Sequence, residues 1–494
     1  MQSVFDQGPP LACPAPFNMA AYVLSHAVAL ADKPALEVVG DTRQTLTYAA
    51  LRQRVTRVAG GLRASGLTEG DRVLFRLGNT ADFPVAYLAC IWAGLIPIPA
   101  SSQLTAPEAS EVARQTTPAL ILHQDGVSLP EHAAQVMGEL PEAEPIEPVM
   151  GDPNRLAYII FTSGTSGKPS GVRHAHRAIW ARRMMWDGWY DLSAQDRVMH
   201  AGAFNWTYTL GTGLMDPWSV GATALIPAEG VISDALAALI AKHDATIFAA
   251  APGVYRQILK SKLPMMPSLR HGLSAGESLP HVLREAWQAA TGTDIHEALG
   301  MSECSTFVSG RPSVPALAHT SGRPQAGRRI AVFENGKPVP VDTAGLLAIH
   351  RSDPGLMLGY LDEDLPAEEW FVTADTVRMS ALGDVTYLGR ADDMMNAGGF
   401  RVSPLEVEGV FSDLSGLTAC AAVAVEIKAN TQVIALFYTS DTPLRDDDMR
   451  THAHALLARY KQPRLYIHRD TLPKGGNGKL NRRLLRDTFE VPND

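Results

Sequence analysis

The residues Phe161-Thr-Ser-Gly-Thr-Ser-Gly-Lys-Pro-Ser-Gly171 say most about the fold of this chain. They follow the apolar run Leu156-Ala-Tyr-Ile-Ile-Phe161, whose β-branched and aromatic side chains predict a buried strand. The loop that comes next consists of glycine and hydroxyl residues. Its backbone N–H groups can approach a ligand closely and form an anion-binding nest. The stretch therefore predicts a strand that leads into a phosphate-binding loop.

The spacing within this loop is not that of a Walker loop. Only two residues separate Gly164 from Gly167, and a proline follows Lys168. A Walker loop has four residues before its Gly-Lys pair and a Ser or Thr after it. A flexible surface turn is the alternative interpretation, because glycine-serine runs are common in loops. The apolar strand before the loop favours phosphate binding.

The composition predicts an ordinary globular enzyme with more than one domain. A chain of 494 residues is too long for a single hydrophobic core. Its hydrophobic content of 46% and charged content of 19% are typical of globular domains. The net charge of −9 and the scattered basic residues argue against a nucleic-acid partner. Cys13, Cys90, Cys304 and Cys420 lie far apart in the sequence, so we predict free thiols in a reducing compartment.

The sequence predicts no integral membrane association. The start, Met1-Gln-Ser-Val, lacks the basic residues of a secretory signal. The longest apolar run, from 85 to 100, is too short to span a bilayer and contains Pro97 and Pro99. We predict that this run forms a buried helix followed by a short strand. A cytoplasmic location is therefore expected.

Helical and strand patterns alternate through most of the chain. Leu51, Val55, Val58 and Leu62 share one helical face, and residues 72–77, 118–123 and 245–251 each predict a strand. This alternation predicts an α/β fold with layered parallel sheets and helices in a large N-terminal domain.

The pattern changes after about residue 390. Residues 406–411 begin a helix, and 421–426 and 432–438 predict paired strands. Met449, His452, Leu456 and Tyr460 suit one face of another helix. A segment of about a hundred residues is a reasonable size for a domain of its own. We therefore expect a small α+β C-terminal domain.

The glycine loop resembles the signature of the adenylate-forming superfamily, which includes acyl-CoA synthetases, adenylation domains of peptide synthetases and luciferases. That signature usually reads Ser-Gly-Thr-Thr-Gly-x-Pro-Lys-Gly. This chain has Ser170 where lysine is usual, and Lys168 is a candidate to replace it in part. The resemblance implies that the loop binds the phosphates of ATP through Thr162, Ser163, Gly164, Thr165, Ser166, Gly167 and Lys168.

A second motif, Leu299-Gly-Met-Ser-Glu303, is similar to the family's Tyr-Gly-x-Thr-Glu. The match implies that Ser302 binds the α-phosphate and that Glu303 holds Mg²⁺, a hard cation that prefers oxygen ligands. In many family members an aromatic residue at the position of Leu299 stacks on adenine. An aliphatic residue at this position resembles benzoate-type ligases. The resemblance places adenine beside Glu297, Ala298 and Leu299, and the acyl group near Gly300.

Three more segments match in the family's order. Ser274-Ala-Gly-Glu-Ser-Leu-Pro280 resembles the adenine-side loop and implies roles for Gly276 and Glu277. Trp370-Phe-Val-Thr-Ala-Asp375 implies that Asp375 accepts hydrogen bonds from both ribose hydroxyls. The segment that starts at Gly389 implies that Arg390 contacts ribose and phosphate and that Asp392 is a hinge. It also implies a CoA thiol tunnel lined by Gly398, Gly399 and Phe400.

Lys479 follows the glycine-rich Leu472-Pro-Lys-Gly-Gly-Asn-Gly478 and matches the family's C-terminal lysine. A compact ammonium charge there would serve the carboxylate and the α-phosphate. The resemblance thus names Lys479, Ser302 and Glu303 as catalytic. It implies an N-terminal acyl- and ATP-binding domain (1–389), a hinge (390–392) and a mobile C-terminal domain (393–494).

The predicted activity is that of an AMP-forming acyl-CoA synthetase acting on a small carboxylic acid, with ATP, CoA and Mg²⁺. Two alternatives stay open: an enzyme that loads a separate carrier protein, and an inactive nucleotide-binding homologue.

The family position of residues 200–218 implies an acyl pocket with Phe204, Trp206 and Tyr208. No Lys or Arg lies in that stretch, so we expect an acid with an uncharged tail, either aromatic or a short-to-medium fatty acid. Simple core packing of these aromatics is the alternative, and Asp216 before Pro217 is predicted to be a turn residue.

Overall fold

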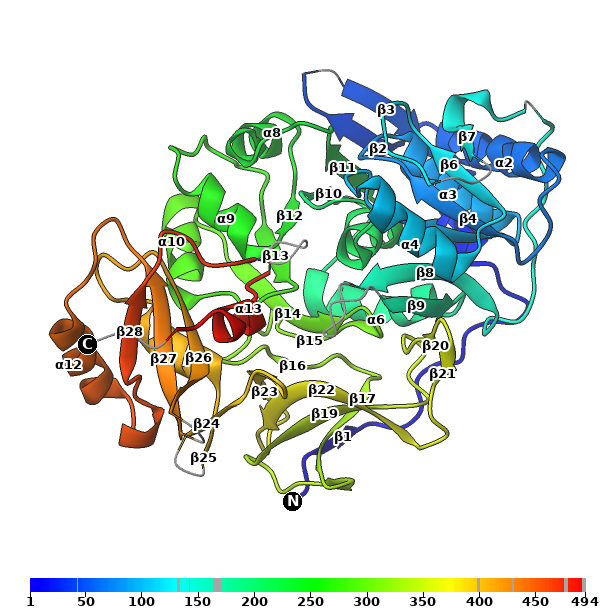
Figure 1. The fold of residues 1–494 in the computed structure, drawn as a ribbon. Coiled ribbons are helices and arrows are strands. Elements are labelled where there is room, and N and C mark those ends of the chain that lie inside the picture. The colour runs from blue at the N-terminus through cyan, green and yellow to red at the C-terminus, as the bar shows by residue number, and fades with distance from the viewer. Residues whose placement is uncertain are drawn as a thin grey trace.

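The computed structural model describes residues 1–41, 43–130, 134–141, 143–162, 170–397, 400–428, 431–474 and 479–490. A large unit of sheets and helices contains most of the chain, and a smaller unit holds its C-terminal part (Figure 1). The α/β class predicted from the sequence is confirmed. No helix of the described residues is both long enough and apolar enough to cross a membrane.

A nine-stranded sheet runs through the centre of the large unit. Its strands from β14 to β2 are parallel, and antiparallel strands flank them at both edges. The order is β16 (Arg323–Pro324), β15 (Ser305–Ser309), β14 (Ile295–Met301), β13 (His271–Ala275), β12 (Ile247–Ala250), β10 (Arg197–His200), β11 (Thr223–Pro227), β2 (Pro34–Val39) and β3 (Arg43–Thr47). The predicted strand at 245–251 is confirmed.

Two four-stranded sheets complete this layered body. One is parallel, in the order β5 (Ile96–Pro99), β4 (Arg72–Arg76), β6 (Leu120–His123) and β7 (Ala134–Val136). The other is antiparallel, in the order β21 (Glu363–Asp364), β20 (Gly359–Tyr360), β9 (Ser170–Ala175) and β8 (Leu156–Thr162). The predicted strand before the glycine loop is therefore present as β8. The loop joins it to β9 as the connection of a hairpin.

The helices of the large unit bury their apolar faces against these sheets. The α-helices are α1 (Met19–Val23), α2 (Tyr48–Ala64), α3 (Asp82–Trp92), α4 (Ala106–Thr116), α5 (Ala178–Ala181), α6 (Arg183–Met185), α7 (Asp216–Val220), α8 (Leu236–Lys242), α9 (Pro252–Ile258) and α10 (His281–Thr291). Short 3₁₀ helices are η1 (Ser25–Ala27), η2 (Met137–Glu139) and η5 (Ser233–Ala235), and π-helical turns are η3 (Trp186–Tyr190) and η4 (Thr209–Met215). Leu51, Val55 and Leu62 of α2 are fully buried, as their spacing predicted.

An antiparallel six-stranded sheet ends the large unit. Its strands are β1 (Val4–Asp6), β17 (Arg329–Glu334), β19 (Ala344–His350), β22 (Trp370–Met379) and β23 (Val385–Arg390), with β18 (Lys337–Pro338) paired to β17. The first strand of the chain thus pairs with a strand more than three hundred residues later.

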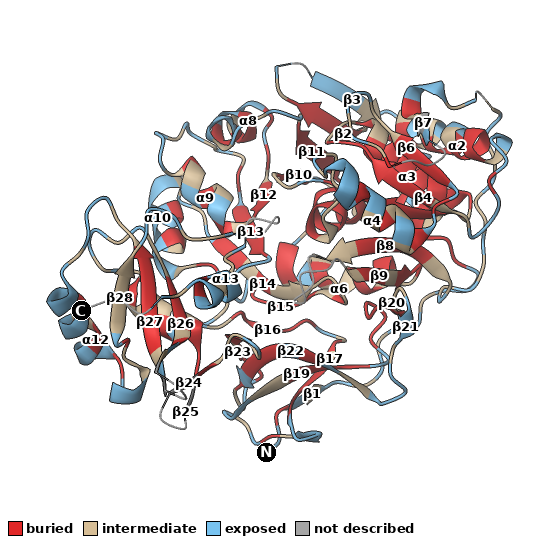
Figure 2. Cartoon of the chain, in the orientation of Figure 1, coloured by how far each residue is buried: buried red, intermediate tan, exposed pale blue. Residues whose placement is uncertain are grey.

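The C-terminal unit has a core of its own, with Met395, Phe411, Leu436 and Met449 in contact. Figure 2 shows its central strands buried and its outer helix α12 largely exposed. Its elements are β24 (Met395–Ala397), β25 (Phe400–Val402), α11 (Pro404–Phe411), β26 (Ala419–Lys428), β27 (Thr431–Thr439), α12 (Asp446–Leu456), η6 (Arg459–Lys461), β28 (Leu465–His468) and α13 (Arg482–Asp487). The predicted pair of strands is present as β26 and β27.

One helix prediction in this unit was wrong. The helix expected to reach Tyr460 ends at Leu456, where the next residue adopts extended backbone. Leu456 is 60% exposed, and the buried face is formed by Met449 and Ala453.

Candidate active site

A large open cleft lies between the two units. The segments that the sequence singled out converge on it, although they are spread over more than three hundred residues. Its walls include Thr162, Ser170, Gly276, Glu277, Glu297, Ala298, Leu299, Gly300, Ser302, Glu303, Tyr360, Asp375, Tyr387, Arg390, Lys479 and Arg482. The cleft is therefore the candidate site for the nucleotide.

Asp375 and Arg390 face one another across two paired strands. They are register partners in β22 and β23, so the sheet itself positions them. Arg390 Nη1 lies 3.5 Å from Asp375 Oδ1, and the Tyr387 hydroxyl donates to the same oxygen at 3.3 Å. Burial raises the pKa of the Asp375 carboxyl, while Arg390 and Tyr387 act against that rise. A carboxylate held in this way can accept hydrogen bonds from the hydroxyl groups of a ligand.

Glu303 and Ser302 follow β14, at the carboxyl end of a central strand. The Tyr360 hydroxyl donates to Glu303 Oε1 at 2.9 Å. His174 Nε2 lies 2.8 Å from the backbone oxygen of Ser302. Burial lowers the pKa of His174 to about 4, so its ring is neutral near pH 7 and this N–H donates. These contacts hold the loop and leave the hydroxyl of Ser302 at the cleft.

Glu303 also meets the requirement for a magnesium ligand. Among the described residues, no group of three or more His, Cys, Asp or Glu side chains could form a metal cage. Mg²⁺ is usually bound by one or two carboxylates together with substrate phosphate oxygens and water, so a cage is not needed. A single carboxylate at the wall of the open cleft fits that pattern.

Lys479 reaches the cleft from the C-terminal unit. Burial lowers the pKa of its ammonium group, while Glu277, Asp375 and Glu303 of the large unit favour its charged form. Lys479 is exposed to the solvent of the open cleft. The structure thus brings the last predicted residue of the chain to the carboxylates of the large unit.

Glu297 lies on β14 at the side of the cleft where the sequence predicts adenine. Its Oε1 accepts a hydrogen bond from the backbone N–H of Leu279 at 3.2 Å, and Arg284 lies 3.6 Å from Oε2. Burial raises the pKa of this carboxyl to about 7. Gly276, in the loop after β13, has a φ of +94°, and a Cβ there would lie 2.8 Å from the Trp206 ring. Because Gly276 has no side chain, the indole of Trp206 can lie against this loop, and a ligand can approach the backbone.

Several predicted residues lie outside the described residues. These are Ser163, Gly164, Thr165, Ser166, Gly167 and Lys168 of the glycine loop and Gly398 and Gly399 of the predicted thiol tunnel; Phe400 is described only by its backbone in β25. Thr162 and Ser170, at the two ends of the glycine loop, line the cleft. Asp392 follows β23 with an exposed side chain, 3.8 Å from Arg390 Nε.

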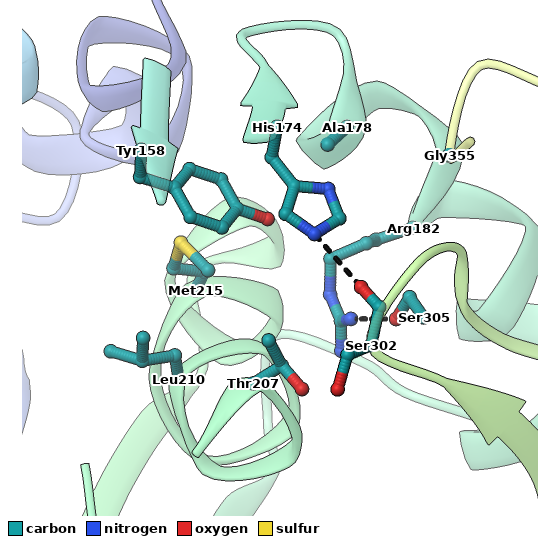
Figure 3. A pocket seen from close by; sticks show the side chains of 10 residues that line it. All are labelled: Tyr158, His174, Ala178, Arg182, Thr207, Leu210, Met215, Ser302, Ser305 and Gly355. Atoms are coloured by element: carbon teal, nitrogen blue, oxygen red, sulfur yellow. Dashed lines mark hydrogen bonds between the residues drawn. The ribbon is translucent and has the colours of Figure 1, made fainter. Parts of the chain in front are cut away.

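A second, more enclosed cavity opens beside Ser302, which lines both spaces. Figure 3 shows polar side chains on one side of it and apolar side chains on the other. Its walls are formed by Tyr158, His174, Ala178, Arg182, Thr207, Leu210, Met215, Ser302, Ser305 and Gly355.

The predicted acyl-pocket residues pack against the core of the large unit. Phe204 is 1% exposed and packs against Phe83 with ring centroids 5.1 Å apart, so it belongs to the main core. Tyr208 donates its hydroxyl to the backbone oxygen of Leu273. Trp206 packs edge-on against Tyr208, and none of these three lines the small cavity. Core packing, the alternative for these aromatics, describes Phe204 and Tyr208 better.

Asp216 differs from the expectation, whereas the acyl-group role of Gly300 stays a prediction. Gly300 lines the large cleft, and a Cβ there would lie 2.5 Å from the backbone oxygen of Ser305, so the close approach of β15 requires glycine. Asp216 is not a turn residue. It is fully buried at the start of α7 and forms an ion pair with Arg182.

Sequence reasoning missed several side chains of the two cavities. Tyr360 and Tyr387 hold the two predicted carboxylates of the cleft, and Arg182, His174 and Ser305 line the enclosed cavity. These residues lie outside the recognised motifs, and their side-chain types do not by themselves indicate a functional site. Their roles become visible only when distant segments are brought together.

Comparisons with known proteins agree with this geometry. A model of the AMP-binding enzyme family matches residues 24–361. The chain is 30% identical to the benzoate–CoA ligase of Thauera aromatica, covering 92% of this chain and 93% of the relative. It is 27% identical to the 3-hydroxybenzoate–CoA/4-hydroxybenzoate–CoA ligase of the same organism, covering 91% and 93%. A crystal structure of a benzoate CoA ligase from Burkholderia xenovorans LB400 matches with a TM-score of 0.85 at 27% identity, covering 95% and 100%.

The chain belongs to the AMP-binding enzyme family. The predicted membership of the adenylate-forming superfamily is thereby confirmed.

Proposed function

We propose that this protein is an AMP-forming acid–thiol ligase that activates an aromatic carboxylic acid with ATP and transfers the acyl group to CoA. The observation that carries the proposal is the convergence of Lys479, Glu303, Asp375 and Arg390 on one cleft in a member of the AMP-binding enzyme family. The names of its relatives, which are benzoate and hydroxybenzoate CoA ligases, support an aromatic acid. The predicted cytoplasmic location goes with this proposal, because ATP and CoA are its co-substrates.

In the first step a carboxylate oxygen attacks the α-phosphorus of ATP. The bond from that phosphorus to the bridging oxygen breaks, and the products are an acyl adenylate and pyrophosphate. Lys479 stabilises the negative charge that gathers where carboxylate and α-phosphate meet, and the Ser302 hydroxyl donates to a phosphate oxygen. The protein contributes positioning and preorganised charge, without a covalent intermediate on a side chain.

The nucleotide is held by the remaining residues of the cleft. Asp375 accepts hydrogen bonds from the ribose hydroxyls, and Arg390 keeps that carboxylate charged while contacting ribose and phosphate. Glu297, Ala298, Leu299, Gly276 and Glu277 lie on the adenine side, and the loop from 162 to 168 receives the phosphates. Mg²⁺ bound by Glu303 would supply neutralising charge at the phosphate oxygens.

In the second step the CoA thiolate attacks the acyl carbon, and AMP leaves with the bonding electrons. We propose that residues 1–389 form the stationary domain and that residues 393–494 rotate about the 390–392 hinge at Asp392 between the steps. The position of Lys479 supports this, because Lys479 faces the cleft as the first step requires. Rotation would move Lys479 away and bring Gly398, Gly399 and Phe400 to the thiol.

The test measures pyrophosphate release and thioester formation separately with purified protein, ATP, Mg²⁺ and benzoate or a hydroxybenzoate. The proposal predicts pyrophosphate release with acid and ATP, and an acyl-CoA mass only when CoA is present. Pyrophosphate without acyl-CoA, but with acyl transfer to a carrier protein, would favour the carrier-loading alternative. Nucleotide binding without pyrophosphate from any acid would favour the inactive homologue.

A further inference from the structure

One short segment of the large unit, residues 353–360, holds Glu303 by its backbone and by its side chain. The Met357 N–H donates to the backbone oxygen of Glu303 at 2.8 Å. Three residues later, the Tyr360 hydroxyl donates to Glu303 Oε1 at 2.9 Å. The 353–360 segment therefore fixes this residue at two points, one on its main chain and one on its carboxylate.

The beginning of the 353–360 segment is anchored in the interior of the large unit. Asp353 accepts a hydrogen bond from Arg328 Nη1 at 2.7 Å, and the side chains of both residues are fully buried. Arg177, which lies just before α5, donates through Nη1 to two backbone oxygens of the segment. Hydrogen bonds with an ionised partner are the strong ones in proteins. The segment therefore reaches Glu303 from a firm base.

The end of the 353–360 segment is part of a sheet. Tyr360 belongs to β20, which pairs with β9 on one side and with β21 on the other (Figure 1). Tyr360 and Val172 are register partners, and the Leu358 N–H donates to the backbone oxygen of Arg173 at 2.8 Å. Sites built on strands are more precise than sites built on loops. The phenol of Tyr360 is therefore well placed to hold another side chain.

The carboxylate of Glu303 needs such a hold, because the cleft contains competing charges. The ammonium group of Lys479 is favoured by the charges of Glu277, Asp375 and Glu303. A Glu303 side chain that rotated freely could turn towards this cation and leave the position of a metal ligand. Burial raises the pKa of the Tyr360 hydroxyl, so it stays a neutral donor near pH 7. Among the described residues, no hydrogen bond reaches the other oxygen of Glu303, Oε2.

We propose that Tyr360 is a positioning residue for Glu303, the proposed magnesium ligand. It acts by holding Oε1, so that the carboxylate keeps the orientation in which it binds the ion. This inference rests on the metal role of Glu303 in the proposed function. Groups that hydrogen-bond to a ligating side chain orient it, and their removal typically lowers metal affinity or activity about 10–100-fold. Tyr360 should therefore control the response to Mg²⁺ without binding the ion itself.

The first test measures how much Mg²⁺ strengthens nucleotide binding. The Kd of α,β-methylene-ATP, which is not cleaved between its α and β phosphates, is determined by titration calorimetry with Mg²⁺ and with EDTA. The ratio of the Kd in EDTA to the Kd in Mg²⁺ reports the coupling between metal and nucleotide. Tyr360→Phe keeps the ring and removes the hydroxyl, so this ratio should fall about tenfold.

The matched control is Tyr387→Phe, the same substitution at another tyrosine of the cleft. The Tyr387 hydroxyl donates to Asp375 Oδ1 at 3.3 Å, and that carboxylate is proposed to bind ribose. Its loss should weaken nucleotide binding equally in Mg²⁺ and in EDTA and leave the ratio at the wild-type value. Equal falls of the ratio in both variants would indicate a general loosening of the cleft and would overturn the inference.

A double-mutant cycle tests whether Tyr360 acts through Glu303. Glu303→Ala should lower the ratio at least as far as Tyr360→Phe does, and adding Tyr360→Phe to it should change the ratio no further. A further fall in the double variant, or an unchanged ratio in a folded Tyr360→Phe variant, would overturn the inference but not the proposed ligase activity. A wild-type ratio of one would overturn the inference together with the metal role of Glu303. Pyrophosphate release with acid and ATP tests the ligase activity independently.

Discussion

The open cleft and the enclosed cavity meet at Ser302 but differ in nearly every other respect. The cleft is lined by charged residues from motifs spread over the chain, and both units contribute to it. The cavity is lined by residues of the large unit alone, and its one charged pair, Arg182 with Asp216, is neutral overall. The comparison therefore indicates that the charged cleft, and not the small neutral cavity, has the side chains that a nucleotide needs.

The largest effect on the reaction rate should come from removing the ammonium group of Lys479. Lys479→Ala should slow pyrophosphate release about 10²–10³-fold, a typical cost for one preorganised electrostatic group. Conversion of supplied acyl-AMP and CoA to thioester should continue, because that step would use the rotated domain. The two half-reactions are measured separately, and equal loss of both in a folded variant would contradict the two-state assignment.

The next largest effect is expected on the free energy of unfolding, when Glu297 at the adenine side of the cleft is replaced. Burial raises the pKa of Glu297 to about 7, above its unfolded value. The protonated carboxyl therefore stabilises the fold at low pH, and this contribution is lost as the pH rises through 7. Glu297→Gln should match the wild type near pH 4 and exceed its unfolding free energy by about 3 kcal/mol above pH 8. Denaturant unfolding at both pH values tests this, and an equal difference at the two would contradict it.

Asp375→Ala should act on the nucleotide and not on the acid. Loss of the proposed bonds to ribose should raise the KM for ATP about 10–100-fold. The ratio of hydroxybenzoate to benzoate turnover should not change, because the proposed bonds of Asp375 are to the ribose. A shift in acid preference would contradict the assignment of Asp375 to the nucleotide.

The smallest expected effect concerns the glycine loop. If Lys168 replaces the lysine that Ser170 lacks, Lys168→Ala should raise the KM for ATP a few-fold. A loop that acts through its backbone N–H groups alone would leave that KM unchanged. Initial rates over a range of ATP concentrations distinguish the two, and Lys260→Ala, which lines neither cavity, is a suitable control.

The same contrast explains how much could be predicted from the sequence. Asp375, Glu303 and Lys479 stand in motifs with fixed neighbours, so their convergence could be predicted without any structure. The alternating patterns likewise predicted α2, β8, β12 and the β26–β27 pair.

The cavity could not be predicted in this way. Arg and Asp side chains are rarely fully buried unless they are paired, so neither residue marks a buried position by itself. Arg182 and Asp216 are buried only because each is the partner of the other, 34 positions away in the chain. Aromatic residues pack in cores as readily as in pockets, which is why the sequence alone left both interpretations open for Phe204 and Tyr208.

The most direct test of acyl-adenylate formation traces a carboxylate oxygen of the acid into the products. Benzoate or a hydroxybenzoate labelled with ¹⁸O in its carboxylate is incubated with the protein, ATP, Mg²⁺ and CoA, and the products are analysed by mass spectrometry. Attack on the α-phosphorus predicts one ¹⁸O atom in AMP, unlabelled pyrophosphate and an acyl-CoA product. Label in pyrophosphate or orthophosphate, or unlabelled AMP beside the thioester, would contradict the acyl-adenylate account.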